Sequence, residues 1–246
     1  MLFIISLVLF IVCCVVVLFL MKKFTNVMVT NLIFVLSIFL CYVALVVKIY
    51  RSVGAHDWNF YNALPTANVS PFMFCTSPLG LILPKKAKQP YLTLVSLLSV
   101  GMFLAPVLSC VYFVSIKYGF FTSILLDYFA HFTLFLWGIY LVRSGQVDLS
   151  VKKAVAGGSV IVCVALVMMV LNLIFDTSFF GLSLRGKHNI YNMVLTPYSA
   201  LSVVIYFVGL VGVLTLGYFF QQLWTKPKPP RQSSTISRWD HFLNRK

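Results

Sequence analysis

The sequence predicts an all-α protein, a polytopic helical membrane bundle with about seven spans. Hydrophobic residues make up 61% of the 246 residues, whereas a soluble domain has about half of its residues in this class. Charged residues make up only 10%, and the mean hydropathy is +0.97. The apolar residues come in runs long enough to cross roughly 30 Å of hydrocarbon as helices. These observations exclude a soluble globular domain.

Short polar or basic connections separate the expected spans. The first apolar run ends at Lys22 and Lys23, and a longer polar connection follows the second run. The seven expected spans are Met1–Met21, Val27–Val47, Ser70–Pro84, Pro90–Ile116, Phe120–Val142, Ala154–Phe175 and Ser199–Leu223. Residues 1–224 are therefore expected to form one transmembrane helical bundle.

The third expected span, Ser70–Pro84, is short and is interrupted by prolines. Pro78 removes one helical hydrogen bond and frees the carbonyl of Phe74, four residues earlier. Backbone groups freed at membrane depth are tolerated only where protein or a water-filled cavity satisfies them. The third span is therefore expected to be a short, Pro-broken helix that lines a pocket.

The distribution of basic residues predicts the orientation. Alternate connections and the carboxyl-terminal segment hold 14 of the 19 lysines and arginines. Cytoplasmic loops are the ones enriched in these residues. We therefore expect a multi-pass protein of the cell (plasma) membrane, with its N-terminus outside and its C-terminus in the cytoplasm.

The net charge of +14 comes from these loops and from the last residues of the chain. Residues 225–246 are expected to form a basic, mostly disordered cytoplasmic tail. Ile236, Trp239 and Phe242 lie near one helical face with basic residues around it, which favours a short helix on anionic lipid. A plain solvated tail is the alternative. No basic-aromatic surface exists outside the loops and tail, so nucleic acid is not an expected partner.

One pair of ionisable residues lies well inside an expected span. The chain has five acidic residues, and only Asp127 is placed deep in an apolar run, four residues before His131. This spacing puts both side chains on one face of a helix. Ionisable residues within a membrane are costly and indicate a functional site by default. Asp127 would fix the tautomer of His131 or keep it basic, although a purely structural polar pair is the alternative.

The depth of Cys75 in the membrane matches that of His131. Cys75 lies ten residues before Lys85, or about 15 Å along a helix, and His131 lies twelve before Arg143, or about 18 Å. A thiol becomes a nucleophile when a base such as histidine stands beside it, and such a pair performs acyl transfer. A cysteine that only packs among apolar residues is the plainer interpretation.

Further polar residues are expected around this pair. Thr76 and Asn172 would support it, for example by stabilising an oxyanion. The side chains expected to bind substrate lie in or near the polar loop before the last span, namely Asp176, Asn189 and Asn192. No C-x-x-C motif occurs, so neither a metal site nor a cofactor is expected.

Two segments carry a family resemblance. SPFMFCTSPLGLIL, followed by DYFAHFTLFLWGIYLV, resembles the paired signature of the YwaF-like bacterial membrane proteins, with a cysteine in the third span and a histidine in the fifth. That family is similar to the animal transmembrane protein 164 family of lipid acyltransferases, thought to act through a cysteine. The resemblance covers about 70–176. It implies that Cys75 is a nucleophile, His131 a base and Asn172 a polar supporting residue.

The sequence leaves three functions open. The first is a membrane lipid acyltransferase or hydrolase that uses Cys75 and His131 in an outward-opening cleft, with a membrane lipid or acyl-lipid as substrate. The second is a small-molecule transporter or ligand-binding membrane subunit with an Asp127–His131 site near the midplane. The third is a structural assembly partner whose polar residues join helices.

Overall fold

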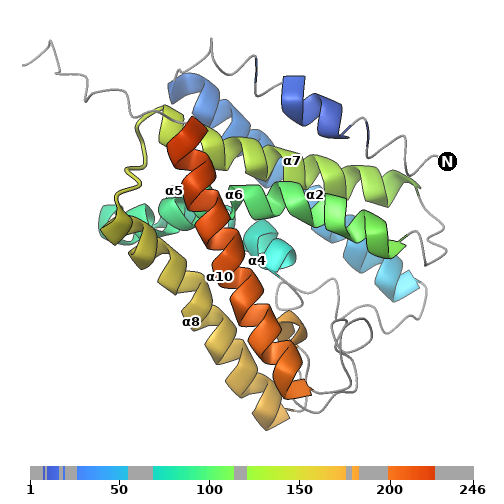
Figure 1. Cartoon of the computed structure of the whole chain (residues 1–246). Coiled ribbons are helices and arrows are strands. Elements are labelled where there is room, and N and C mark those ends of the chain that lie inside the picture. The colour runs from blue at the N-terminus through green and yellow to red at the C-terminus, as the bar shows by residue number, and fades with distance from the viewer. Residues whose placement is uncertain are drawn as a thin grey trace, which may run out of the picture.

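The computed structural model describes residues 8, 10–16, 19, 27–54, 69–113, 121–175, 179–182 and 199–224 (Figure 1). This part of the chain is helical and contains no strand. Its elements are α2 (Val27–Gly54), α4 (Val69–Thr76), α5 (Leu79–Ile82), α6 (Lys85–Phe113), α7 (Phe121–Arg143), α8 (Val151–Phe175), the 3₁₀ turn η1 (Phe179–Gly181) and α10 (Ser199–Trp224). The expected tail, 225–246, lies outside the described residues.

Four of the described helices are long and apolar enough to cross a membrane. They are Met28–Val47 in α2, Lys85–Val107 in α6, Val151–Phe175, which is α8, and Val203–Leu223 in α10. This finding confirms a membrane-embedded helical protein. The number of seven spans stays a prediction.

Helix α6 is the centre of the bundle. It packs along α7, α8 and α10, and 61% of its span is buried, compared with 22% for the spans of α8 and α10. α7 runs beside both α2 and α6, and α8 and α10 extend away from these helices toward the bottom of the view in Figure 1. Phe10, from the first expected span, stacks on Phe103 of α6 and contacts Tyr128 of α7. Phe10 thereby packs against both α6 and α7.

Each of the three helices around α6 approaches it through a glycine. A Cβ built on Gly138 of α7 would meet Ser99 at 2.6 Å, and one on Gly157 of α8 would meet Thr93 at 2.7 Å. A Cβ on Gly217 of α10 would overlap the backbone carbonyl of Leu97. Small residues at such crossings let membrane helices come into close van der Waals contact. The central packing of the bundle therefore depends on these glycines.

The first turn of α6 lies earlier in the chain than the sequence indicated. The helix begins at Lys85, five residues before the expected start at Pro90. The amides of Ala87 and Lys88 donate to the carbonyl of Pro84, at 3.0 Å and 2.9 Å, and these bonds start the helix. Pro90 is accommodated near the amino-terminal end. The basic connection that was expected here is therefore part of the helix.

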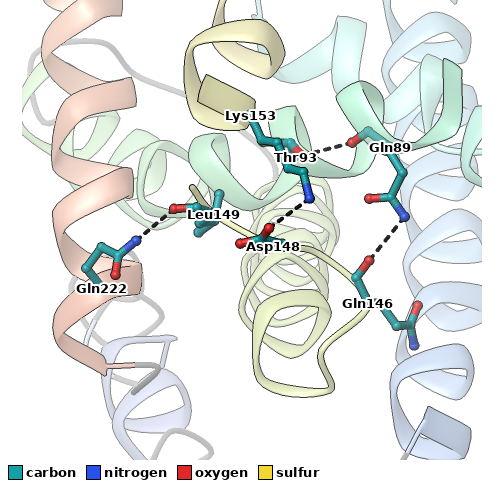
Figure 2. A network of polar contacts seen from close by, with 7 residues as sticks. All are labelled: Gln89, Thr93, Gln146, Asp148, Leu149, Lys153 and Gln222. Carbon is teal, nitrogen blue, oxygen red and sulfur yellow. Dashed lines mark hydrogen bonds and ion pairs between the residues drawn. The ribbon is translucent and has the colours of Figure 1, made fainter. Parts of the chain in front are cut away.

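Side-chain amides fasten the connection between α7 and α8 (Figure 2). Gly145, at φ 74°, ends α7 in the left-handed conformation that favours glycine. Gln89 of α6 donates to the carbonyl of Gln146 at 3.3 Å, and Gln222 of α10 donates to that of Leu149 at 2.8 Å. The connection is therefore tied to two other helices.

An ion pair in this connection predicts a small pH dependence of stability. Lys153 donates to Asp148 at 2.7 Å, and this hydrogen bond holds the pKa of Asp148 below its usual range. A depressed folded-state pKa stabilises the fold above the unfolded pKa of about 3.9, and that stability is lost as the pH falls. Both side chains are more than half exposed, so Asp148→Asn should cost only about 0.3 kcal/mol at pH 7.

Thermal unfolding of the detergent-solubilised protein at pH 7, 5, 4 and 3 measures this effect. Asp148→Asn and Lys153→Gln should each remove the same acid-sensitive component. If the stability of both variants falls between pH 7 and pH 3 by as much as that of the native chain, the acid sensitivity belongs to other groups.

Candidate functional site

His131 is held in one tautomer by the backbone of its own helix. The ring is buried in α7, and its Nδ1 lies 2.7 Å from the carbonyl oxygen of Asp127. A carbonyl only accepts hydrogen bonds, so Nδ1 carries the proton that it donates. The lone pair of the neutral ring is then on Nε2. A histidine oriented in this way can take a proton at Nε2.

The carboxylate of Asp127 lies beside the same ring. Its Oδ2 is 3.7 Å from Nδ1 of His131, and the side chain is 26% exposed compared with 5% for the histidine. The four-residue spacing therefore brings the two groups together on one face of α7. The backbone carbonyl of Asp127, rather than its carboxylate, makes the short hydrogen bond that orients the ring. The carboxylate is placed to stabilise a protonated imidazole.

The turn that carries Cys75 packs against His131. Phe74, which is fully buried in α4, presents its ring to the imidazole in an edge-on arrangement, with centroids 4.9 Å apart. The Cys75 side chain is half-buried and makes no hydrogen bond with another described residue. The Tyr42 hydroxyl of α2 is close enough to interact electrostatically with the thiol. The histidine and the turn that carries the cysteine are thus neighbours, while the thiol lies next to α2.

Helix α4 ends at Thr76, and α5 starts after Pro78. The carbonyl of Phe74 accepts a hydrogen bond from the Ser77 hydroxyl at 2.8 Å. This is the carbonyl that Pro78 leaves without its helical amide donor. A local hydroxyl therefore satisfies the freed backbone group.

Two tyrosines satisfy the next two carbonyls of α4. The Tyr42 hydroxyl of α2 donates to the carbonyl of Cys75 at 3.0 Å, and the Tyr91 hydroxyl of α6 donates to that of Thr76 at 2.8 Å. The last carbonyls of a helix have no intrahelical partner, so such donors are required within a membrane. The Thr76 hydroxyl donates within α4, to the carbonyl of Phe72 at 2.8 Å. Protein side chains therefore donate to each of these carbonyls.

Asn172 uses its amide to hold η1. Its Nδ2 donates to the carbonyls of Phe179 and Leu182, at 2.9 Å and 3.1 Å, and its Oδ1 accepts from the amide of Phe179 at 2.7 Å. Phe180 is fully buried in this turn and has a φ of 56°, which is strained for a bulky residue. Its ring contacts Phe72 of α4, with centroids 5.7 Å apart. Asn172 therefore acts on α4 through η1, and its amide is directed at that turn.

The other expected site residues lie outside the described part of the chain. They are Asp176, Asn189 and Asn192. Among the described residues, no group of three histidine, cysteine or acidic side chains is arranged to hold a metal ion.

Sequence reasoning missed Tyr42, Tyr91 and Ser77, which hold the end of α4. The two tyrosine contacts join residues 33 and 15 positions apart, so no local motif marks them, whereas Ser77 bonds to Phe74 three residues earlier. The available signal was a phenol in each of the two apolar runs, because a tyrosine hydroxyl in apolar surroundings needs a partner. No protein-family model, curated protein or solved structure matches this chain.

Proposed function

We propose that the chain is an integral membrane lipid acyltransferase or hydrolase in which Cys75 is the nucleophile and His131 the base. Nε2 of His131 takes the thiol proton, and the thiolate attacks the acyl carbon of a lipid ester. The C–S bond forms, the C–O bond breaks, and the leaving alcohol takes the proton from the imidazolium. Water or an acceptor alcohol then attacks the thioester, with the histidine again removing the proton and returning it to the sulfur.

The contact between Phe74 and His131 supports this proposal more than any other observation. It brings the residue next to Cys75 to within 4.9 Å of the imidazole, measured between ring centroids. The bond from His131 to the Asp127 carbonyl directs proton transfer to Nε2. The thiol has to move toward Nε2 when the substrate binds, as catalytic groups in empty active sites often do.

The proposal includes a membrane topology. The chain crosses the plasma membrane seven times, with α4 and α5 as a Pro-broken third span, the N-terminus outside and the C-terminus in the cytoplasm. Asp127 lies about one turn farther outward than His131, so the reacting groups face a cleft that opens away from the cytoplasm. The lipid enters this cleft sideways from the outer leaflet.

A lipid-like thiol reagent tests the nucleophile. Full-length protein in membranes is treated with a long-chain N-alkyl maleimide, and the modification of each cysteine is followed by peptide mass spectrometry. Cys75 should react about tenfold faster than Cys163, an exposed cysteine of α8, because His131 takes the thiol proton as the reagent adds to the sulfur. His131→Ala should remove this difference.

Asp127→Asn is the matched control for that experiment. It keeps the backbone carbonyl that orients His131, so labelling of Cys75 should fall much less than in His131→Ala. Equal labelling of Cys75 and Cys163, or labelling of Cys75 that does not depend on His131, would rule out the thiol as the nucleophile.

A second function is favoured by the paired carboxylate and imidazole in α7. Asp127 and His131, 3.7 Å apart, form a group that can bind and release a proton during transport. Proton-coupled uptake lost in Asp127→Asn and kept in Cys75→Ser would favour this transporter over the enzyme.

A further inference from the structure

One end of the bundle collects cationic side chains at the ends of three helices. We call it the basic end and define it by the lysines at the start of α6, the arginine that ends α7 and the lysines at the start of α8. These residues are Lys85, Lys86, Lys88, Arg143, Lys152 and Lys153. The connection tied down by Gln89 and Gln222 lies between them, so the helix ends are held together (Figure 2).

The lysines of the basic end lie at the amino-terminal ends of α6 and α8, where the helix dipole disfavours positive charge. The amino terminus of a helix carries partial positive charge, which stabilises acidic residues and destabilises basic ones. Neither α6 nor α8 has an acidic residue in its first turn, and both begin with lysines. An anion from outside the chain would offset both the lysine charges and the helix dipoles.

The chain supplies little compensation of its own. Asp148 is the acidic residue of this region, and it pairs with Lys153. The other five cations form no ion pair with any residue that the structure describes. Nη1 of Arg143 and Nε2 of Gln146 are buried donor atoms that have no acceptor in the described structure. The Gln146 side chain points away from the other labelled residues in Figure 2.

We propose that the basic end binds the phosphate groups of anionic membrane lipids. The ends of membrane-crossing helices lie at the level of lipid headgroups, where several cations face the same leaflet. The Arg143 guanidinium is suited to bidentate contact with phosphate, and the lysines add point charges. This site is independent of Cys75 and His131, and it does not depend on the function proposed above.

The test uses the full-length protein in neutral detergent micelles and a fluorescent phosphatidylglycerol as the probe. Unlabelled phosphatidylglycerol should compete with the probe, whereas phosphatidylcholine and inorganic phosphate should not. Arg143→Gln should weaken binding about fivefold, the effect of one cation at an anionic surface. Arg51→Gln, the same change in the last turn of α2, is the matched control and should bind like the native chain.

Asp148→Asn should change the affinity for phosphatidylglycerol in the opposite direction, and a loss of folding would not do so. It removes the acidic residue of the basic end and should tighten phosphatidylglycerol binding. Arg143→Lys, which keeps the charge, should bind more tightly than Arg143→Gln. Equal weakening in Arg143→Gln and Arg51→Gln, equal competition by phosphatidylcholine, or no tightening in Asp148→Asn would overturn the proposal. Competition by inorganic phosphate alone would overturn the assignment to a lipid.

Discussion

Replacing Gly217 with alanine is expected to separate α10 from α6 and to lower the stability of the whole bundle. The added methyl would overlap the backbone carbonyl of Leu97, which cannot rotate away as a side chain can. Overpacking of this kind costs about 3 kcal/mol when the obstacle is backbone. Thermal unfolding of the purified protein in detergent, followed by loss of the monodisperse peak on size exclusion, measures the effect.

A second contact should make the loss larger. Gln221 lies one turn after Gly217 and is fully buried. Its Nε2 donates to the hydroxyl of Ser99 at 3.1 Å and to the carbonyl of Ser96 at 3.2 Å, both in α6. Moving α10 outward breaks these bonds as well. Gly217→Ala should therefore disrupt both the close packing and the buried hydrogen bonds between α10 and α6.

The same helix provides a matched control. A Cβ on Gly212 would meet no atom within 4 Å, so Gly212→Ala adds the same methyl group without a clash. That variant should be neutral or more stable by up to about 1 kcal/mol, because alanine favours the helix. Equal losses in Gly217→Ala and Gly212→Ala would mean that the approach to Leu97 does not determine stability.

The membrane class of this chain follows from composition, because apolar runs need no partner to identify them. Helix bounds were less predictable. The lysines before Pro90 suggested a connection, yet α6 begins at Lys85 because the Pro84 carbonyl accepts two amides. Proline and charge patterns give local preferences, whereas these hydrogen bonds depend on how the chain turns after α5.

The candidate site shows the same division between local and long-range information. The neighbourhood of Asp127 and His131 follows from a spacing of four residues in a helix. Phe74, which precedes Cys75, contacts His131, whereas the depth of Cys75 in a membrane stays a prediction. The tyrosine bonds to the end of α4 depend on side chains from α2 and α6. Nothing within one segment specifies such contacts.

Asn172→Ala is the second substitution that we expect to lower stability strongly. Asn172 is also the residue whose surroundings differ most from those expected. The resemblance implies a polar role beside the catalytic pair, whereas its amide makes three hydrogen bonds to the backbone of η1. Asn172→Ala leaves those backbone groups without this partner and should cost about 3 kcal/mol, since each buried unsatisfied group costs about 1–3 kcal/mol. Thermal unfolding measures the loss, with Ser159→Ala as control, because that exposed hydroxyl donates to the carbonyl of Ala156 within α8.

The labelling of Cys75 separates the structural role of Asn172 from a catalytic one. If Asn172 acts through η1, its loss frees the strained Phe180 and weakens the packing on Phe72, so stability and labelling should fall together. The labelling of Cys75 in Asn172→Ala should then recover at low temperature in membranes that contain anionic lipid and no detergent, because the bundle stays folded there. A variant with native stability and no labelling of Cys75 would contradict this account, because it would require the amide to act on the reacting groups directly. The hydrogen bonds to Phe179 and Leu182 already occupy the amide, so we expect the structural outcome.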